Sequence, residues 1–242
     1  MIPLTHAMVL AAGLGTRMRP LTDERPKPLL ELDGRSLLDH ALDRLASAGV
    51  GDAVVNAHWL GAQVETAMAR RTSPRITLQH EDALLETGGS VTLALPQLGS
   101  NPFVVVNGDA FWLDGPTAAL TRLAAAFDPA EMDALLLMVL TTQVEGSVGK
   151  GDFLLDPVGR MRRPKEREIA PYLYAGVQIL SPALFDEAPE GAFSLNVLYD
   201  RAIEAGRLFG LVHDGLWFHL STPADLANAE ATLRAGLVRA LF

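Results

Sequence analysis

Cysteine is absent from this sequence of 242 residues, and no apolar run approaches the length of about 18 residues that indicates a membrane-spanning helix. The absence of cysteine excludes a disulfide framework, a thiolate zinc site and a cysteine nucleophile. Basic residues are outnumbered, because 20 Lys and Arg face 29 Asp and Glu, for a net charge of −9. We therefore expect neither a nucleic acid nor a membrane as a partner.

Residues 1–6 lack the basic region of a signal peptide, so we expect a cytoplasmic protein. Hydrophobic residues make up 49% of the chain, which supports a packed core and argues against disorder. The chain contains no internal repeat and no hexapeptide array, so we expect no C-terminal β-helix. The prediction is a single domain over residues 1–242.

Short apolar runs alternate with helix-period segments through the first half of the chain. The runs lie at 7–10, 53–56, 103–106 and 135–140. Ser36 is expected to cap a helix that stops near Gly49, and a second helix is predicted over about 61–70. Strands that are apolar on both faces and separated by helices predict an α/β fold. In it, a mostly parallel, Rossmann-like sheet lies between two helical layers.

The second half of the chain is less regular. Apolar segments at 153–155 and 177–180 predict two more strands. Ser194 is expected to cap a helix, and Thr222 with Pro223 is expected to begin another, because Pro suits the first helical position.

A glycine-bearing loop follows the first predicted strand. Gly13 and Gly15 let backbone N–H groups approach phosphate oxygens without a Cβ in the way. Met18 stands where a dinucleotide fingerprint would have its third glycine, and the Gly-Lys-Ser/Thr of a P-loop is also missing. A tight turn after a strand would explain the two glycines on their own.

The charges of this loop favour a functional interpretation. Residues 13–28 hold four basic and two acidic residues, a local charge of +2 in a chain of −9. Prolines at positions 20, 26 and 28 stiffen the loop, which lowers the entropy lost when it closes on an anion. The basic residues are Arg17, Arg19, Arg25 and Lys27.

Asn107-Gly108-Asp109 follows the predicted strand at 103–106, at the carboxyl end where parallel-sheet enzymes bind their ligands. A turn Asp is the ordinary explanation of such a residue. With a phosphate-binding loop nearby, Asp109 gains a second explanation, since carboxylate oxygens suit Mg²⁺ and Mg²⁺ pairs with phosphate.

The pattern L-A-A-G-x-G-T-R-M-x-P-L-T at 10–22, followed by K-P at 27–28, resembles the nucleotide-binding loop of the sugar-1-phosphate nucleotidylyltransferases. The resemblance implies a fold of the nucleotide-diphospho-sugar transferase or GT-A type. It also implies that Arg17 holds the triphosphate, that Lys27 contacts the phosphates at the reacting centre and that Asp109 binds Mg²⁺. The resemblance further assigns nucleotide contacts to Ala11, Ala12, Gly13, Gly15, Thr16 and Asn107.

Residues 85–90 predict a second glycine-bearing turn before a helix-like segment at 91–95. A helix N-terminus capped by Thr or Ser is the alternative. A similar turn in the family lies against the nucleobase, which implies base contacts from Thr87 and Gly88. Two further candidates for the base pocket precede this turn: Gln79 and Glu81.

Within this family, the chain is most similar to the short uridylyltransferases that act on N-acetylmuramic acid 1-phosphate. The shared stretches are 56–61, 85–89, 107–109 with Trp112, 151–153 and 175–177. The likeness implies a nucleotide-binding part over roughly 1–115 and a sugar-binding part over roughly 116–242. The expected sugar contacts are Glu86, Asp152, Gly176 and Asn196. For Gly176, which lies in a strand-like run, a bulge in the strand is the alternative. Lys150 or Lys165 could meet the sugar phosphate, and each is equally well explained as surface charge.

One segment departs from the family pattern W-x-D-V-G-T-P. Here residues 217–223 place His219 at the position of a second metal-binding Asp and Ser221 at the position of the Gly. A neutral imidazole suits Mn²⁺, Co²⁺ or Zn²⁺ better than Mg²⁺. His219 is therefore a candidate ligand of another metal, a hydrogen-bond donor to phosphate, or a partly buried polar residue without a role.

The sequence contains no Ser-His-Asp, Cys-His or paired-carboxylate constellation. The resemblance implies direct attack of a sugar 1-phosphate on the α-phosphorus of an NTP, with pyrophosphate leaving. UTP and N-acetylmuramic acid 1-phosphate are the expected substrates. The alternatives are guanylyl or thymidylyl transfer to mannose, glucose or heptose 1-phosphate, a non-catalytic nucleotide-sugar sensor, and a glycosyltransferase. The missing first Asp of an Asp-x-Asp motif at 107–109 argues against the last.

Overall fold

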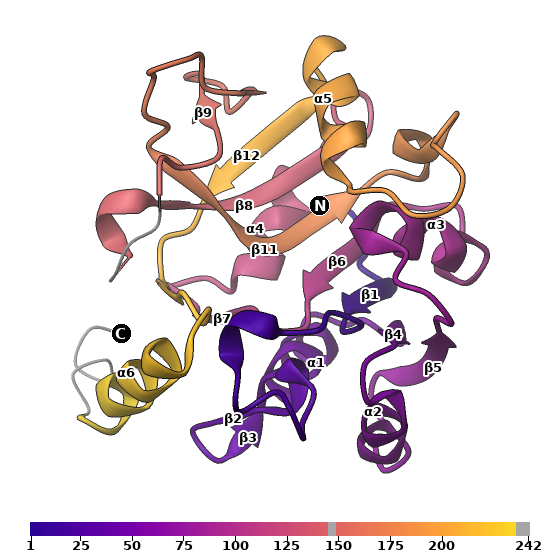
Figure 1. The fold of residues 1–242 in the computed structure, drawn as a ribbon. Helices are drawn as coiled ribbons and strands as arrows, with labels where there is room; N and C mark the ends of the chain where they lie inside the picture. Colours follow the sequence, from indigo (N-terminus) through magenta and orange to yellow (C-terminus); the bar gives the residue numbers. More distant parts are fainter. Residues whose placement is uncertain (145–148, 236–242) are drawn as a thin grey trace.

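The computed structural model describes residues 1–144 and 149–235. Its centre is a seven-stranded sheet with the order β12-β8-β11-β6-β1-β4-β5 (Figure 1). Within it, β11 runs antiparallel to its neighbours β6 and β8, and the other pairs are parallel. The strands are β1 (His6–Leu10), β4 (Asp52–Ala57), β5 (Arg75–His80), β6 (Phe103–Asn107), β8 (Ala134–Leu140), β11 (Tyr172–Leu180) and β12 (Leu208–Val212). The predicted α/β fold with a mostly parallel sheet is confirmed.

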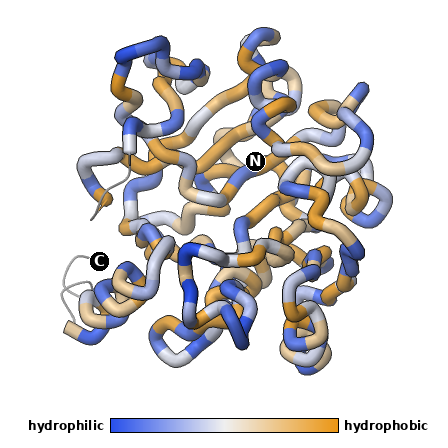
Figure 2. Tube along the Cα trace, viewed as in Figure 1, coloured by the Kyte–Doolittle hydropathy of each residue, from blue (hydrophilic) through white to orange (hydrophobic). Residues whose placement is uncertain are grey.

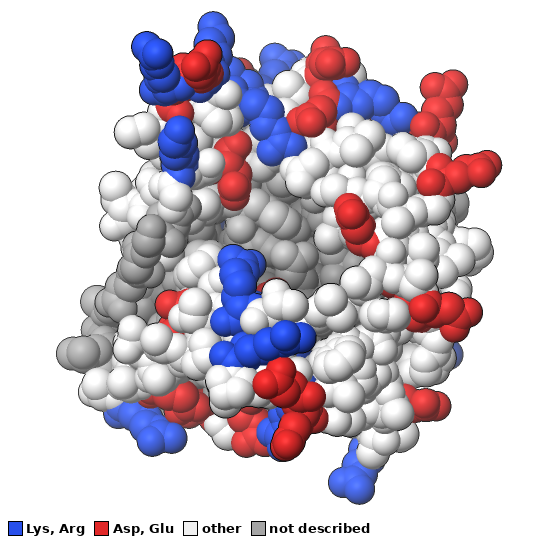
Figure 3. Space-filling model, in the orientation of Figure 1, with Lys and Arg blue, Asp and Glu red and all other residues white. Residues whose placement is uncertain are grey.

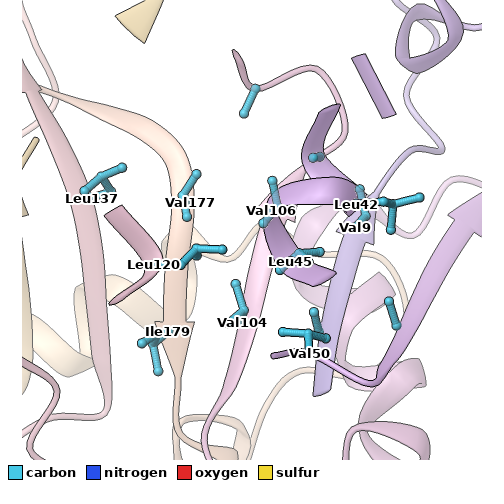
Figure 4. Packing of buried hydrophobic residues seen from close by; sticks show 14 of the residues in the cluster. Val9, Leu42, Leu45, Val50, Val104, Val106, Leu120, Leu137, Val177 and Ile179 are labelled. Carbon is cyan, nitrogen blue, oxygen red and sulfur yellow. The ribbon is translucent and has the colours of Figure 1, made fainter. Parts of the chain in front are cut away.

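Helices cover both faces of the sheet. Val104 and Val106 of β6 belong to one buried core, which also contains residues of α1, α2 and α4. Val105 belongs to a second core with residues of α3 and α5, because successive side chains of a strand point to opposite faces. The helices are α1 (Leu37–Ser47), α2 (Gly61–Met68), α3 (Glu86–Leu98), α4 (Ala119–Ala126), α5 (Asn196–Glu204) and α6 (Pro223–Arg234). Hydrophobic residues dominate the central strands (Figure 2), and Figure 4 shows side chains of the first core.

Short strand pairs and 3-10 turns connect these layers. β2 (Glu31–Leu32) pairs with β3 (Arg35–Ser36), β7 (Phe111–Leu113) with β13 (Leu216–Phe218), and β9 (Leu154–Leu155) with β10 (Met161–Arg162). The 3-10 turns are η1 (Thr16–Met18), η2 (Lys27–Leu29), η3 (Thr141–Gln143) and η4 (Pro182–Phe185).

A third core holds the C-terminal segment against the N-terminal loop. Met18 of η1, Phe111 of β7 and Leu220 are buried together, and Ala229 of α6 packs into the same cluster. This core, with the β7–β13 pair, places residues 217–221 beside the glycine-bearing loop. Residues about 200 positions apart in the sequence therefore meet at one edge of the sheet.

Two of the predicted helix caps are confirmed and one needs a correction. Ser36 Oγ accepts a hydrogen bond from the Asp39 N–H, and Thr222 forms a capping box with Asp225. The third predicted cap, Ser194, lies one residue too early, because α5 begins at Asn196. Its hydroxyl still accepts a hydrogen bond from the Asn196 N–H at 3.3 Å.

The predicted turn at 85–90 is wrong, because α3 already begins at Glu86. The glycines serve close packing inside the helix. A Cβ on Gly88 would overlap the ring of Phe193, and one on Gly89 would overlap the Gly191 carbonyl. Among the residues described, no helix combines the length and apolar character that crossing a membrane requires.

Candidate active site

Two hollows meet at the edge of the sheet where β1 and β6 end. We call them the first lobe, a cavity of about 330 Å³, and the second lobe, of about 310 Å³. Five of the described residues line both lobes: Arg17, Lys27, Asn107, Asp109 and Ser221. Figure 3 shows the face hollowed near its centre, with basic side chains along the lower edge of the hollow. The predicted triphosphate and metal residues thus lie at the junction of two cavities.

The glycine-bearing loop is folded tightly beneath the first lobe. Gly15 has a φ of 60°, and a Cβ there would lie 3.0 Å from Lys27 Cβ and 3.0 Å from Thr22 Cγ2. The Thr22 hydroxyl donates to the Gly15 carbonyl at 2.9 Å. Glycine is therefore required where the loop passes the segment that carries Lys27.

The β1–β6 junction places Asp109 opposite Lys27. The Gly108 N–H donates to the Leu10 carbonyl at 2.8 Å, which ties the turn after β6 to the end of β1. Lys27 Nζ lies 2.5 Å from Asp109 Oδ2. The Lys27 side chain is 12% exposed and that of Asp109 is 38% exposed, so the carboxylate is the more open partner.

A buried amide network supports the floor of the first lobe. Asn56 Oδ1 accepts from the Ala11 N–H at 2.6 Å, and Asn56 Nδ2 donates to Glu81 Oε1 at 2.8 Å. Gln79 Nε2 donates to the same Glu81 oxygen at 3.2 Å and to the Ser90 carbonyl at 3.0 Å. Glu81 lines the lobe as predicted, whereas Gln79 and Ala11 stand behind the wall and line neither lobe.

Sequence reasoning did not assign a role to Asn56, although it lines the first lobe and joins three segments. The signal was an amide side chain at the end of an otherwise apolar predicted strand. A buried Asn in that place must find partners for all of its polar atoms, and here it finds them at the ends of β1 and β5 and on Ser90 of α3.

Of the remaining predicted residues in the loop and in α3, some line the first lobe and others only contact neighbouring segments. Glu86, predicted as a sugar contact, lines the first lobe with Thr87, and its φ is 56°. Thr87 Oγ1 accepts from the Leu195 N–H at 2.9 Å. Gly88 lines neither lobe, and its N–H donates to the Phe193 carbonyl at 2.8 Å. The predicted loop residues that line the first lobe are Ala12, Gly13, Gly15, Thr16 and Arg17.

The second lobe is built around a bulge in β11. Gly176 has a φ of 81°, and a Cβ there would lie 3.2 Å from Asn107 Nδ2. The pairing of β11 with β8 shifts register around this residue. Asp152 lines the lobe and accepts from the Tyr174 N–H at 2.9 Å, and Trp217 Nε1 donates to the Ala175 carbonyl at 2.9 Å.

Besides Glu86, three predicted sugar-side residues are not brought to the second lobe. Asn196 accepts from Arg163 Nη2 at 2.7 Å and lines neither lobe. The Arg163 guanidinium lies 4.3 Å from the centre of the Phe153 ring, which fixes its direction. Lys150 and Lys165 also lie outside both linings.

The donors available to a metal ion are few and mixed. Asp109 and His219 both line the second lobe, and the His219 ring centre lies 5.7 Å from that of Trp217. In the described part of the chain, no three His, Asp or Glu side chains gather into a metal-binding cluster. The donor set therefore fits an ion that takes its other ligands from substrate phosphates.

The fold shifts the pKa values of two groups near the site, those of Tyr174 and Asp225. Burial raises the pKa of the Tyr174 hydroxyl well above its usual value, so this wall residue stays protonated. Burial also disfavours the charged form of Asp225. Hydrogen bonds from the Thr222 hydroxyl and from the N–H groups of Thr222 and Ser221 outweigh that cost, and the pKa of Asp225 is lowered.

Comparison with known proteins agrees with this geometry. The family described as "MobA-like NTP transferase domain" matches residues 7–168. The chain belongs to this family and is a nucleotidyltransferase, as the loop motif predicted. It is 44% identical to the N-acetylmuramate alpha-1-phosphate uridylyltransferase of Caulobacter vibrioides, over 94% of this chain and 96% of that one.

Two further relatives extend the comparison. The N-acetylmuramate alpha-1-phosphate uridylyltransferase of Neisseria meningitidis is 36% identical, over 93% of this chain and 96% of that one. The solved structure of a UDP-glucose pyrophosphorylase complexed with UDP-glucose superposes with a TM-score of 0.82 at 14% identity, covering 96% of this chain and 99% of that one. The structural likeness confirms the predicted fold type.

Proposed function

We propose that this chain transfers the uridylyl group of UTP to N-acetylmuramic acid 1-phosphate, giving the UDP-sugar and pyrophosphate. The observation that carries the proposal is the junction of two lobes at Arg17, Lys27 and Asp109. Two relatives at 44% and 36% identity are named for this activity, and they support the choice of base and sugar.

The reaction requires two anionic substrates to meet, and the residues of the junction suit that task. A sugar 1-phosphate is largely ionised near neutral pH, since its second pKa is about 6, so no general base is needed. Arg17 and the backbone of residues 13–16 hold the triphosphate, and Lys27 offsets negative charge at the α-phosphorus. Catalysis then comes from positioning and electrostatics, as in other phosphoryl-type transfers.

The proposed cofactor is a divalent ion, Mg²⁺ or, because of His219, Mn²⁺. Asp109 would hold it and His219 would be a second protein ligand. When bound, the ion neutralises phosphate charge and makes the phosphorus a better electrophile. The carboxylate and imidazole fit such an ion only as part of a larger ligand set that includes substrate oxygens.

Each lobe binds one of the two substrates. The nucleotide occupies the first lobe, where Glu81 and Thr87 face the base, and the sugar occupies the second lobe, between Asp152 and Gly176. The nucleotide-binding part extends over roughly 1–115 and the sugar-binding part over roughly 116–242. Trp217, Phe218 and His219 of the second part complete the wall of the second lobe.

The test is a matrix of nucleoside triphosphates against sugar 1-phosphates, followed by pyrophosphate release with Mg²⁺ and with Mn²⁺. The expected result is highest kcat/KM for UTP with N-acetylmuramic acid 1-phosphate. A higher kcat/KM for another pair would change the proposed substrates but leave the proposed type of reaction unchanged. Binding of UTP without turnover in every well would instead support a sensor, and transfer from a UDP-sugar would support a glycosyltransferase.

A further inference from the structure

Ser221 lies at the meeting point of the two lobes, between β13 and α6. It lines both lobes with four other residues. Three of those already have a role in the proposed reaction or its metal site, and the fourth, Asn107, is expected to contact the nucleotide. Its relative exposure is 6%, so the residue is almost fully buried. Its position in the fold therefore marks Ser221 as a candidate contact to the transferred group.

The backbone around Ser221 is held firmly. Its N–H donates to Asp225 Oδ2 at 3.1 Å, and the Thr222 N–H donates to the same oxygen at 2.7 Å. The neighbouring Leu220 is buried in the third core. The hydroxyl is thus anchored at its Cα and free only to rotate about χ1.

The Ser221 hydroxyl has no hydrogen bond to any residue in 1–144 or 149–235, unlike the buried hydroxyls of Thr22 and Ser90. Thr22 Oγ1 donates to the Gly15 carbonyl, and Ser90 Oγ accepts from Asn56 Nδ2. Ser221 Oγ is not fully enclosed by other atoms, so it opens to the lobes. A donor that the fold does not use, in a hollow between cations, is available to a ligand.

We propose that the Ser221 hydroxyl donates a hydrogen bond to a non-bridging oxygen of the phosphate at which nucleotidyl transfer occurs. The proposal rests on the proposed function. With the nucleotide in the first lobe and the sugar phosphate in the second, the reacting phosphorus lies where the lobes meet, and Ser221 is part of that wall. Phosphate oxygens only accept hydrogen bonds, so the hydroxyl acts as the donor. Its bond strengthens as charge develops on those oxygens.

The test compares S221A with T222A, its neighbour in the chain. Thr222 caps α6 and lines neither lobe, so T222A should lower the melting temperature and leave kcat within about twofold. S221A should keep the melting temperature and lower kcat roughly 10- to 100-fold, as expected for a lost hydrogen bond to a charged group. S221T, which restores a hydroxyl, should recover part of the loss.

Affinity for UTP, measured by calorimetry, separates failure of this inference from failure of the proposed function. S221A should bind UTP several-fold more weakly than the wild-type protein, whether or not turnover is seen. If the wild-type protein turns over and S221A matches it in kcat and in UTP affinity, the role of Ser221 is refuted and the function stands. Equal losses of kcat in S221A and T222A would also refute it. If no pair gives product, the proposed function fails, and unchanged UTP affinity in S221A would refute the inference as well.

Discussion

Replacing Lys27 by Met removes the ammonium at the junction and keeps most of the side-chain volume. We expect kcat to fall about 10²- to 10³-fold, the cost of losing one preorganised group that stabilises developing charge. The free energy of unfolding should change by only about 1 kcal/mol. Asp109, the ion-pair partner, is 38% exposed and is solvated by water once Lys27 is gone.

The same substitution should tighten the binding of a free divalent ion. Lys27 Nζ lies 2.5 Å from Asp109 Oδ2 and repels any cation that approaches that carboxylate. Coulomb's law gives ~2 kcal/mol for a divalent ion and an ammonium 4 Å apart in water, which corresponds to about 30-fold in affinity. Calorimetry with Mn²⁺ in the absence of nucleotide measures this change, and pyrophosphate release measures kcat.

R19M is the matched control for K27M. Arg19 belongs to the same loop, pairs with Asp23 at 3.2 Å and lines neither lobe. R19M should therefore change kcat and Mn²⁺ affinity by less than about threefold. Wild-type turnover in K27M would refute the role of Lys27. Equal losses in the two variants would show that general loop charge, and not the position of this ammonium, supports turnover.

Three further outcomes follow from the packing. G176A should raise the KM for the sugar phosphate with little change in UTP affinity, because its Cβ would lie 3.1 Å from Ala110 Cβ in the second lobe and alanine is strained at a φ of 81°. Steady-state kinetics with each substrate varied checks this. G88A should cost about 1–3 kcal/mol by overpacking against Phe193, whereas G51A, with no atom within 4 Å of its Cβ, should be nearly neutral in urea titrations. Burial lowers the pKa of His213, so the folded state binds its proton less readily than the unfolded chain, and stability should decline as pH falls below about 6.5. H213Q should flatten that decline in urea titrations at pH 7.5 and 5.5, and an unchanged slope would contradict this assignment.

Local sequence was sufficient to predict features that depend on neighbouring residues. Ser36 and Thr222 were identifiable as caps because a cap bonds to the N–H three residues on. The apolar runs predicted strands, but a run that is apolar on both faces carries no sign of its direction. The reversal of β11 was therefore not predicted. A bulge at Gly176 was expected as the alternative to a sugar contact, but its place beside Asn107 depends on that reversal and was not predicted.

The two lobes were predictable to different degrees for the same reason. The largest share of the first lobe's lining from any one continuous segment comes from 12–28, whose spacing is visible as a motif. The second lobe is assembled from distant segments, and its composition depends on side-chain directions. Asn196 was expected there, but Arg163 holds it elsewhere through a bond of 2.7 Å. In the sequence, Ser221 is only a departure from the family pattern. Its place where the two lobes meet depends on the tertiary fold, which local sequence patterns do not predict.

The order of strands explains why Asp109 lies between the two lobes. The chain crosses from β1 to β4 on one side and reaches β6 on the other, so the loops after β1 and β6 diverge and leave a crevice at their ends. The antiparallel β11 then lies next to β6 and brings residues 173–176 to the same edge from the opposite direction. The turn after β6 is thus shared by both lobes through topology alone. In the proposed reaction, a group there lies where the attacking sugar phosphate meets the α-phosphorus of the nucleotide. Its substitution should therefore affect turnover more than the affinity for either substrate alone.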